Sequence, residues 1–220
     1  MKKLLIGVLT ILAYQNSNAQ EEITYKPTTG TITTEVGLTG GLNNANFNLN
    51  GGVLKFRYFL KEDLGVRLGL GVYNSNDEDV TGQSPNQITY TDKLSSNTIK
   101  LGIEKHFAGA NRLSTYAGAD LLVRFGKELD EENEENGDFQ KTESKNSSFG
   151  VAIFTGADYY ITQKVFLGVE AGLNFLSTKY KDEEYSFKNG NNTGSSSDPG
   201  KKESDFVSNV FGGVRIGFQF

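Results

Sequence analysis

The chain has 220 residues, a formal net charge of −5 and no cysteine. The lack of cysteine excludes disulfide bonds and thiolate metal sites, and an acidic chain without a basic cluster argues against nucleic acid as a partner. The 26 glycines and only 3 prolines fit long strands that have to bend.

The first residues have the three parts of a secretory signal peptide. Two lysines follow the initiator methionine, residues 4–14 form a short apolar run, and Ser17 and Ala19 are the small residues expected before a cleavage site. The apolar run is too short to cross a bilayer as a helix. The sequence therefore predicts a signal peptide over 1–19 and a single domain over 20–220, because about 200 residues fit one domain.

Beyond the signal peptide, eight segments alternate between apolar and polar residues with the period of a β-strand. The C-terminal segment shows the alternation most clearly, with Val214, Ile216 and Phe218 on the same face as the final residue, Phe220. The eight predicted strands lie near 31–41, 51–60, 64–74, 97–107, 113–126, 147–160, 164–177 and 206–220.

The connections between these segments are alternately short and long. Residues 61–63, 108–112 and 161–163 are short turns, and the longer connections lie near 42–50, 75–96, 127–146 and 178–205. This alternation is typical of an outer-membrane barrel with tight periplasmic turns and long external loops.

The two faces of the segments differ sharply in chemistry. One face carries large apolar side chains, and the other carries glycines and charges. An eight-stranded barrel encloses just enough space for side chains, so the apolar face has to point into lipid. The sequence predicts an all-β fold, an eight-stranded antiparallel up-and-down transmembrane β-barrel in the cell outer membrane.

Aromatic residues on the apolar face gather at its two ends, as they do at the two interfaces of a membrane. Those near the short turns and the C-terminus are Tyr58, Phe107, Tyr159, Phe218 and Phe220, and those near the long connections are Phe125, Phe149, Phe175 and Phe206.

The whole mature chain resembles the small eight-stranded outer-membrane barrels of the outer-membrane-protein-A and -X type. The most specific element of the resemblance is the ending formed by Val214, Ile216, Phe218 and Phe220. The resemblance implies that this ending is the signal recognised by the barrel-assembly machinery. It also implies outer-membrane lipid and lipopolysaccharide as surroundings of the barrel.

The charges on the opposite face are predicted to form a network in the lumen. Bases and acids are nearly balanced, and an unpaired buried charge is costly, so we expect ion pairs that plug the barrel. A narrow conducting path for ions or small solutes is the alternative. The residues of the predicted lumen network are Glu35, Lys55, Arg57, Arg67, Lys100, Glu104, Asp120, Arg124, Asp158, Glu170 and Arg215.

The only histidine, His106, is predicted to face inward beside a short turn. A catalytic histidine needs a nucleophile within hydrogen-bond reach, and no sequence motif marks one here. We therefore expect a structural histidine, and the sequence predicts no catalytic residue, cofactor or metal site.

Two long connections have unusual compositions. The connection at 127–146 is dense in carboxylates, which could bind Ca²⁺, but the calcium-loop spacing is absent, and we expect a solvated, mobile loop. Residues 189–200 are of low complexity and are predicted to be disordered. The resulting hypothesis is a non-enzymatic integral outer-membrane protein with a structural or surface-interaction role, whose surface ligand stays open.

Overall fold

The computed structural model describes residues 24–39, 53–107, 109–199 and 205–220, and the side chains of all of these except 38, 39 and 205–210. The predicted signal peptide and the predicted connection at 42–50 lie outside these residues. Among the described residues, no helix is long and apolar enough to span a bilayer.

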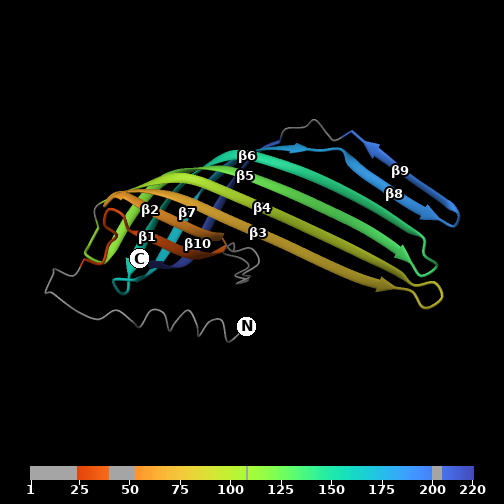
Figure 1. The fold of residues 1–220 in the computed structure, drawn as a ribbon, viewed down its shortest axis with the longest axis horizontal. Coiled ribbons are helices and arrows are strands. Elements are labelled where there is room, and N and C mark those ends of the chain that lie inside the picture. The colour runs from red at the N-terminus through yellow and green to blue at the C-terminus, as the bar shows by residue number, and fades with distance from the viewer. Residues whose placement is uncertain (1–23, 40–52, 108, 200–204) are drawn as a thin grey trace.

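Eight antiparallel strands form a closed ring (Figure 1). Each strand pairs with its neighbours in sequence, and the first pairs with the last, as Val36 facing Ile216 illustrates. The ring therefore has no free edge that would expose backbone groups to hydrocarbon. Its strands are β1 (Ile32–Thr39), β2 (Val53–Lys61), β3 (Leu64–Thr81), β4 (Ile88–Phe107), β5 (Leu113–Glu134), β6 (Phe139–Tyr160), β7 (Val165–Tyr180) and β10 (Asp205–Gln219).

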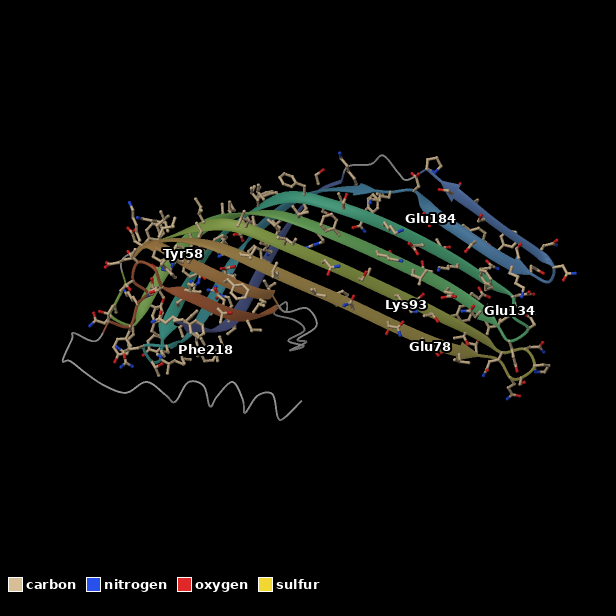
Figure 2. All side chains as sticks on the ribbon, viewed as in Figure 1. Tyr58, Glu78, Lys93, Glu134, Glu184 and Phe218 are labelled. Carbon is tan, nitrogen blue, oxygen red and sulfur yellow. The ribbon has the colours of Figure 1, made fainter. Side chains whose placement is uncertain are left out.

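The predicted facing of the strands is confirmed for the described side chains. Apolar side chains point outward, and Leu101 remains 59% exposed, whereas the charged Arg57 is 1% exposed inside the ring. This arrangement is the reverse of a water-soluble protein and matches a barrel surrounded by lipid. Tyr58 and Phe218 both lie at the end of the barrel that holds the C-terminus (Figure 2). The side chain of Phe206 lies outside the described residues.

The predicted long connections are the main difference between expectation and structure. Strands β3 to β6 do not end at the barrel but continue as two hairpins, as far as Thr81 and Ile88 in one and Glu134 and Phe139 in the other. Two further strands, β8 (Glu183–Asn189) and β9 (Asn192–Asp198), form a hairpin that pairs with β6. We call this protruding sheet the extension, and it comprises 75–81, 88–96, 127–134 and 139–146 together with β8 and β9 (Figure 1).

The extension corrects two predictions. The acidic stretch at 127–146 was predicted to be a mobile loop, but it forms the outer part of the regular hairpin between β5 and β6. Residues 192–198, within the stretch predicted to be disordered, form β9. The sequence did not reveal these strands because both faces of the extension are exposed to water. A strand exposed to water on both faces has no apolar alternation, so the signal on which the prediction depends is absent.

Candidate functional site

The lumen is the best-defined candidate site, and its shape is set by pairs of aromatic residues and glycines on neighbouring strands. Phe166 faces Gly217, Phe154 faces Gly118, and Tyr116 faces Gly156 across the strand pairs. A side chain on any of these glycines would collide with the ring opposite. The glycines therefore make room for rings that turn inward and fill the barrel.

Arg57 lies at the centre of the lower part of the lumen, near the short turns. Its guanidinium donates to Glu104 at 3.0 Å and to Asp158 at 2.7 Å. It also lies 3.0 Å from Glu35. These four side chains are fully buried, so each charge depends on the others for compensation.

A second layer is built around Arg67. This guanidinium donates to Asp120 at 2.7 Å and to Glu170 at 2.9 Å, and its central carbon lies 3.4 Å from the ring centre of Phe154. Lys55 donates to the same Glu170 at 3.0 Å. Because these residues come from β2, β3, β5, β6 and β7, the layer ties opposite walls of the barrel together.

Arg215 on β10 joins the two layers. Its guanidinium donates to Glu35 at 2.5 Å and to Asp158 at 3.0 Å, and it also donates to the hydroxyl of Tyr116. Tyr116 in turn donates to Glu170 at 3.2 Å. One continuous network thus spans the barrel from the first strand to the last.

Lys100 and Arg124 belong to the predicted network but do not enter the ion pairs. Within the described part of the chain, neither has a carboxylate within 4.0 Å. Lys100 places its ammonium 5.0 Å from the ring centre of Phe211, and Arg124 donates to the hydroxyl of Thr98 at 3.3 Å. Both residues lie above the two layers, toward the extension, where the lumen is more exposed.

A small cavity of about 50 Å³ marks the top of the plug. Its walls include Lys55, Lys100 and Glu170 together with the ring of Phe211. The cavity has room for one or two water molecules, and its lining includes the side chains of Arg67 and Arg215.

His106 has a nucleophile beside it, contrary to the sequence-based expectation. One ring nitrogen lies 2.7 Å from the hydroxyl of Ser114, and the other lies 2.9 Å from Glu104. This order of groups is that of a hydrolytic triad. However, Ser114 is 3% exposed, and Glu104 already accepts hydrogen bonds from Arg57 and Arg67. The group therefore extends the buried network of the plug.

The end of the barrel near the short turns is covered by the segment that precedes β1. The hydroxyl of Tyr25 accepts from Arg112 at 2.6 Å, and the guanidinium also lies 4.1 Å from the ring centre. The side-chain amide of Gln219 donates to the Tyr25 carbonyl at 2.9 Å. These contacts hold the segment against this end of the barrel.

Several network members were missed from sequence, namely Thr33, Ser114 and Tyr116, together with the inward rings of Phe59, Phe154, Tyr160 and Phe166. His106 was predicted to face inward, but its place in the network was not predicted. The strand parity that identified the charges applies to these residues as well. The expectation that glycines and charges alone would fit the lumen led away from them, because it overlooked the space that a glycine gives to the ring opposite.

The extension has its own electrostatics outside the barrel. Glu143 lies between Lys127 and Lys145, at 2.9 and 2.7 Å from their ammonium groups. Hydrogen bonds from Lys145 and then Lys127 lower the pKa of this carboxyl to about 2. The carboxylate is therefore charged at any physiological pH.

A comparison with known families settles the class of the protein. Residues 42–220 match the family described as the putative OmpA-OmpF-like porin family. The chain belongs to this family. As a member of this porin family with a closed ring of lipid-facing strands, it is an integral outer-membrane β-barrel protein.

Several solved structures are similar to this porin-family chain. The N-terminal β-barrel domain of Pseudomonas aeruginosa OprF is 15% identical, with 88% of this chain and 100% of that one covered and a TM-score of 0.46. Ail, the attachment invasion locus protein of Yersinia pestis, is 12% identical, with coverages of 88% and 100% and a TM-score of 0.39. Acinetobacter baumannii CarO is 17% identical, with coverages of 87% and 98% and a TM-score of 0.41. No curated protein sequence matches the chain.

Proposed function

We propose that this protein is a non-conducting, non-enzymatic outer-membrane anchor that presents the extension outside the cell as an interaction surface. The observation that carries the proposal is the contrast between the two halves of the molecule. The lumen is filled by a buried, cross-linked network, whereas β3 to β6 continue as a broad sheet beyond the barrel. A plugged barrel with a protruding sheet suits binding rather than transport.

The plug supports the absence of conduction. An ion path needs a continuous column of water, but the guanidiniums of Arg57 and Arg67 bridge acids on facing walls at exposures of 1% and 3%. Opening a path would separate several buried ion pairs at once, and breaking even one such pair costs about 3–5 kcal/mol.

The lack of cysteine allows a direct test of which end faces outside. Lys93→Cys lies in the extension and Glu62→Cys lies in a short turn, so each variant has a single thiol. We expect a membrane-impermeant maleimide to label the Lys93→Cys variant on intact cells, and to label the Glu62→Cys variant only after the outer membrane is permeabilised. The reverse pattern would reject the external location of the extension.

The narrow pore is the second candidate, and the porin description of the family favours it. Planar-bilayer recordings of the purified protein separate the two functions. Silence at the membrane potentials used for porins is expected for the plug. Stable unitary conductance steps would instead assign the lumen charges to ion passage.

A further inference from the structure

Charge is sorted between the two faces of the extension. The strand register places side chains of the extension either on the face that continues the lumen, called here the inner face, or on the face that continues the lipid-facing side, called the outer face. Among the described residues, the inner face carries no lysine or arginine. Its acidic side chains are Asp77, Asp79, Asp92, Glu128, Asp130, Glu132, Glu134, Glu183 and Asp198.

The outer face of the same strands has a balanced charge. Figure 2 shows Glu78, Lys93 and Glu184 on the extension, and all three belong to the outer face. The acids of this face are Glu78, Glu131, Glu143 and Glu184, and its bases are Lys93, Lys127, Lys141, Lys145 and Lys188. The excess of acid is thus a property of one face and does not follow from the overall composition of the sheet.

Repulsion is relieved on the outer face but not on the inner face. On the outer face Lys127 lies directly opposite Lys145, and Glu143 bridges the two. On the inner face Asp77 lies opposite Asp92, and Asp92 lies opposite Asp130, which forms a row of three aspartates across three strands. Like charges in such positions destabilise a sheet.

No group of the described chain supplies a counter-charge to the aspartate row, since none of the ion pairs there includes Asp77, Asp92 or Asp130. Burial and the neighbouring charge of Asp92 raise the pKa of Asp130. No set of three or more carboxylates or histidines in the described residues converges closely enough to hold a metal ion. The compensating charge is therefore expected from a ligand that spreads over the face.

Aromatic and apolar side chains lie among these carboxylates. Tyr90 and Leu94 are 39% and 43% exposed, and the stacked rings of Tyr185 and Phe187 are 5.9 Å apart. A hollow of about 230 Å³ near the tip is lined by both of these rings, by Glu132 and Glu134, and also by Lys188, which belongs to the outer face by register. Carboxylates beside aromatic rings suit lysine and arginine side chains, which combine ion pairs with cation–π contacts.

We propose that the inner face of the extension docks a basic protein segment, rich in lysine or arginine, that belongs to a partner outside the cell. Charge complementarity selects this occupant, because phosphates of lipopolysaccharide would be repelled by an acid-only face and a single metal ion has no convergent site there. The partner would neutralise the aspartate row. This inference names the partner class for the surface proposed above and rests on that proposal.

The test uses the full-length protein in lipid nanodiscs and a short fluorescent polylysine peptide, with binding followed by anisotropy. The affinity should fall between about 50 and about 200 mM salt, because exposed charges are screened. Neutralising the row with Asp77→Asn, Asp92→Asn and Asp130→Asn should weaken binding about tenfold. The control Glu78→Gln, Glu131→Gln and Glu184→Gln removes the same charge from the outer face and should change affinity less than about twofold.

Three results would overturn the inference, namely no binding by the wild-type protein, equal losses in the two triple variants, or displacement of the peptide by micromolar Ca²⁺. Circular dichroism of each variant checks that the strands have formed. The thiol-labelling experiment is independent of the peptide. If the peptide binds the inner face but Lys93→Cys is labelled only after permeabilisation, the extension does not lie outside the cell and the proposed surface role is wrong. The inner face would still be a docking site for a basic segment.

Discussion

At the scale of single residues, the lumen depends on which charges have partners. Arg67 contacts three carboxylates, whereas Lys100 contacts an aromatic ring and has no carboxylate within 4.0 Å in the described chain. Both were predicted from strand parity to be lumen charges. Strand parity determines the face on which a residue lies, but not its position along the barrel axis relative to residues on other strands. It therefore could not distinguish Arg67 from Lys100.

The difference between these two bases leads to the first prediction. Arg67→Met should lower the free energy of unfolding by about 3–5 kcal/mol, because Glu104, Asp120 and Glu170 lose a shared counter-charge. Lys100→Met removes a base of similar length and should cost about 1 kcal/mol or less. Urea unfolding in lipid vesicles measures both. Equal losses would contradict the assigned roles.

A second prediction at this scale concerns the glycines that face inward rings. Gly217→Ala would place a methyl group against the ring of Phe166 and should cost about 1–3 kcal/mol through overpacking. Gly37→Ala is the matched control, because the added methyl group would lie 3.7 Å from both the Cγ of Arg215 and the Val53 carbonyl oxygen, which is an ordinary contact. The same unfolding assay should show a loss of less than about 1 kcal/mol for the control.

At the scale of elements, the sequence predicted a strand wherever lipid lies on one side and the packed lumen on the other. All eight barrel strands were found, because an apolar face beside a polar face produces alternation. The outer halves of β3 to β6 and the β8–β9 hairpin were missed, because Asp77 and Glu78, for example, point to opposite faces and both meet water. Pairing between backbones holds these parts of the sheet.

The boundary between the lipid-facing and water-facing parts of a strand can be tested within β3. Leu68 and Val80 lie on the same side of this strand and are similarly exposed, at 38% and 46%. Leu68→Arg should destabilise the barrel by about 2–4 kcal/mol, because it places a charge near the middle of the hydrocarbon.

Val80→Arg lies in the extension and should leave the stability of the barrel within about 0.5 kcal/mol of the wild type. Unfolding in vesicles gives both values. A large loss for Val80→Arg would place the membrane boundary farther along β3 than the alternation indicates.

At the scale of the whole molecule, strand parity predicted the closed ring, its orientation to lipid and the set of lumen charges. The individual contacts were beyond the sequence, since they depend on the stagger of strands far apart in the chain. Arg215 and Glu35 meet at 2.5 Å across a separation of 180 residues only because β10 returns to β1. Closure of the ring is therefore the event that assembles the network.

The strand that closes the ring is followed by Phe220, whose backbone and ring make separate contributions. Its backbone amide donates to the Ile32 carbonyl at 2.8 Å, and its carbonyl accepts from the Ile32 amide at 3.3 Å. Its ring is 72% exposed at the end of the barrel near the short turns, where aromatic side chains favour a membrane interface. From the resemblance to small outer-membrane barrels, we propose that the ring is also part of the signal for the assembly machinery.

Deleting Phe220 should lower the yield of membrane-inserted protein in cells, while refolding into vesicles should still form the barrel, because one residue contributes few ladder bonds. Phe220→Ala keeps both backbone bonds and removes only the ring. If the ring is the assembly signal, this substitution should lower insertion in cells as much as the deletion does. Normal insertion of the alanine variant at wild-type expression would show that the ring is not the assembly signal. Phe220 would then contribute only to closing the sheet.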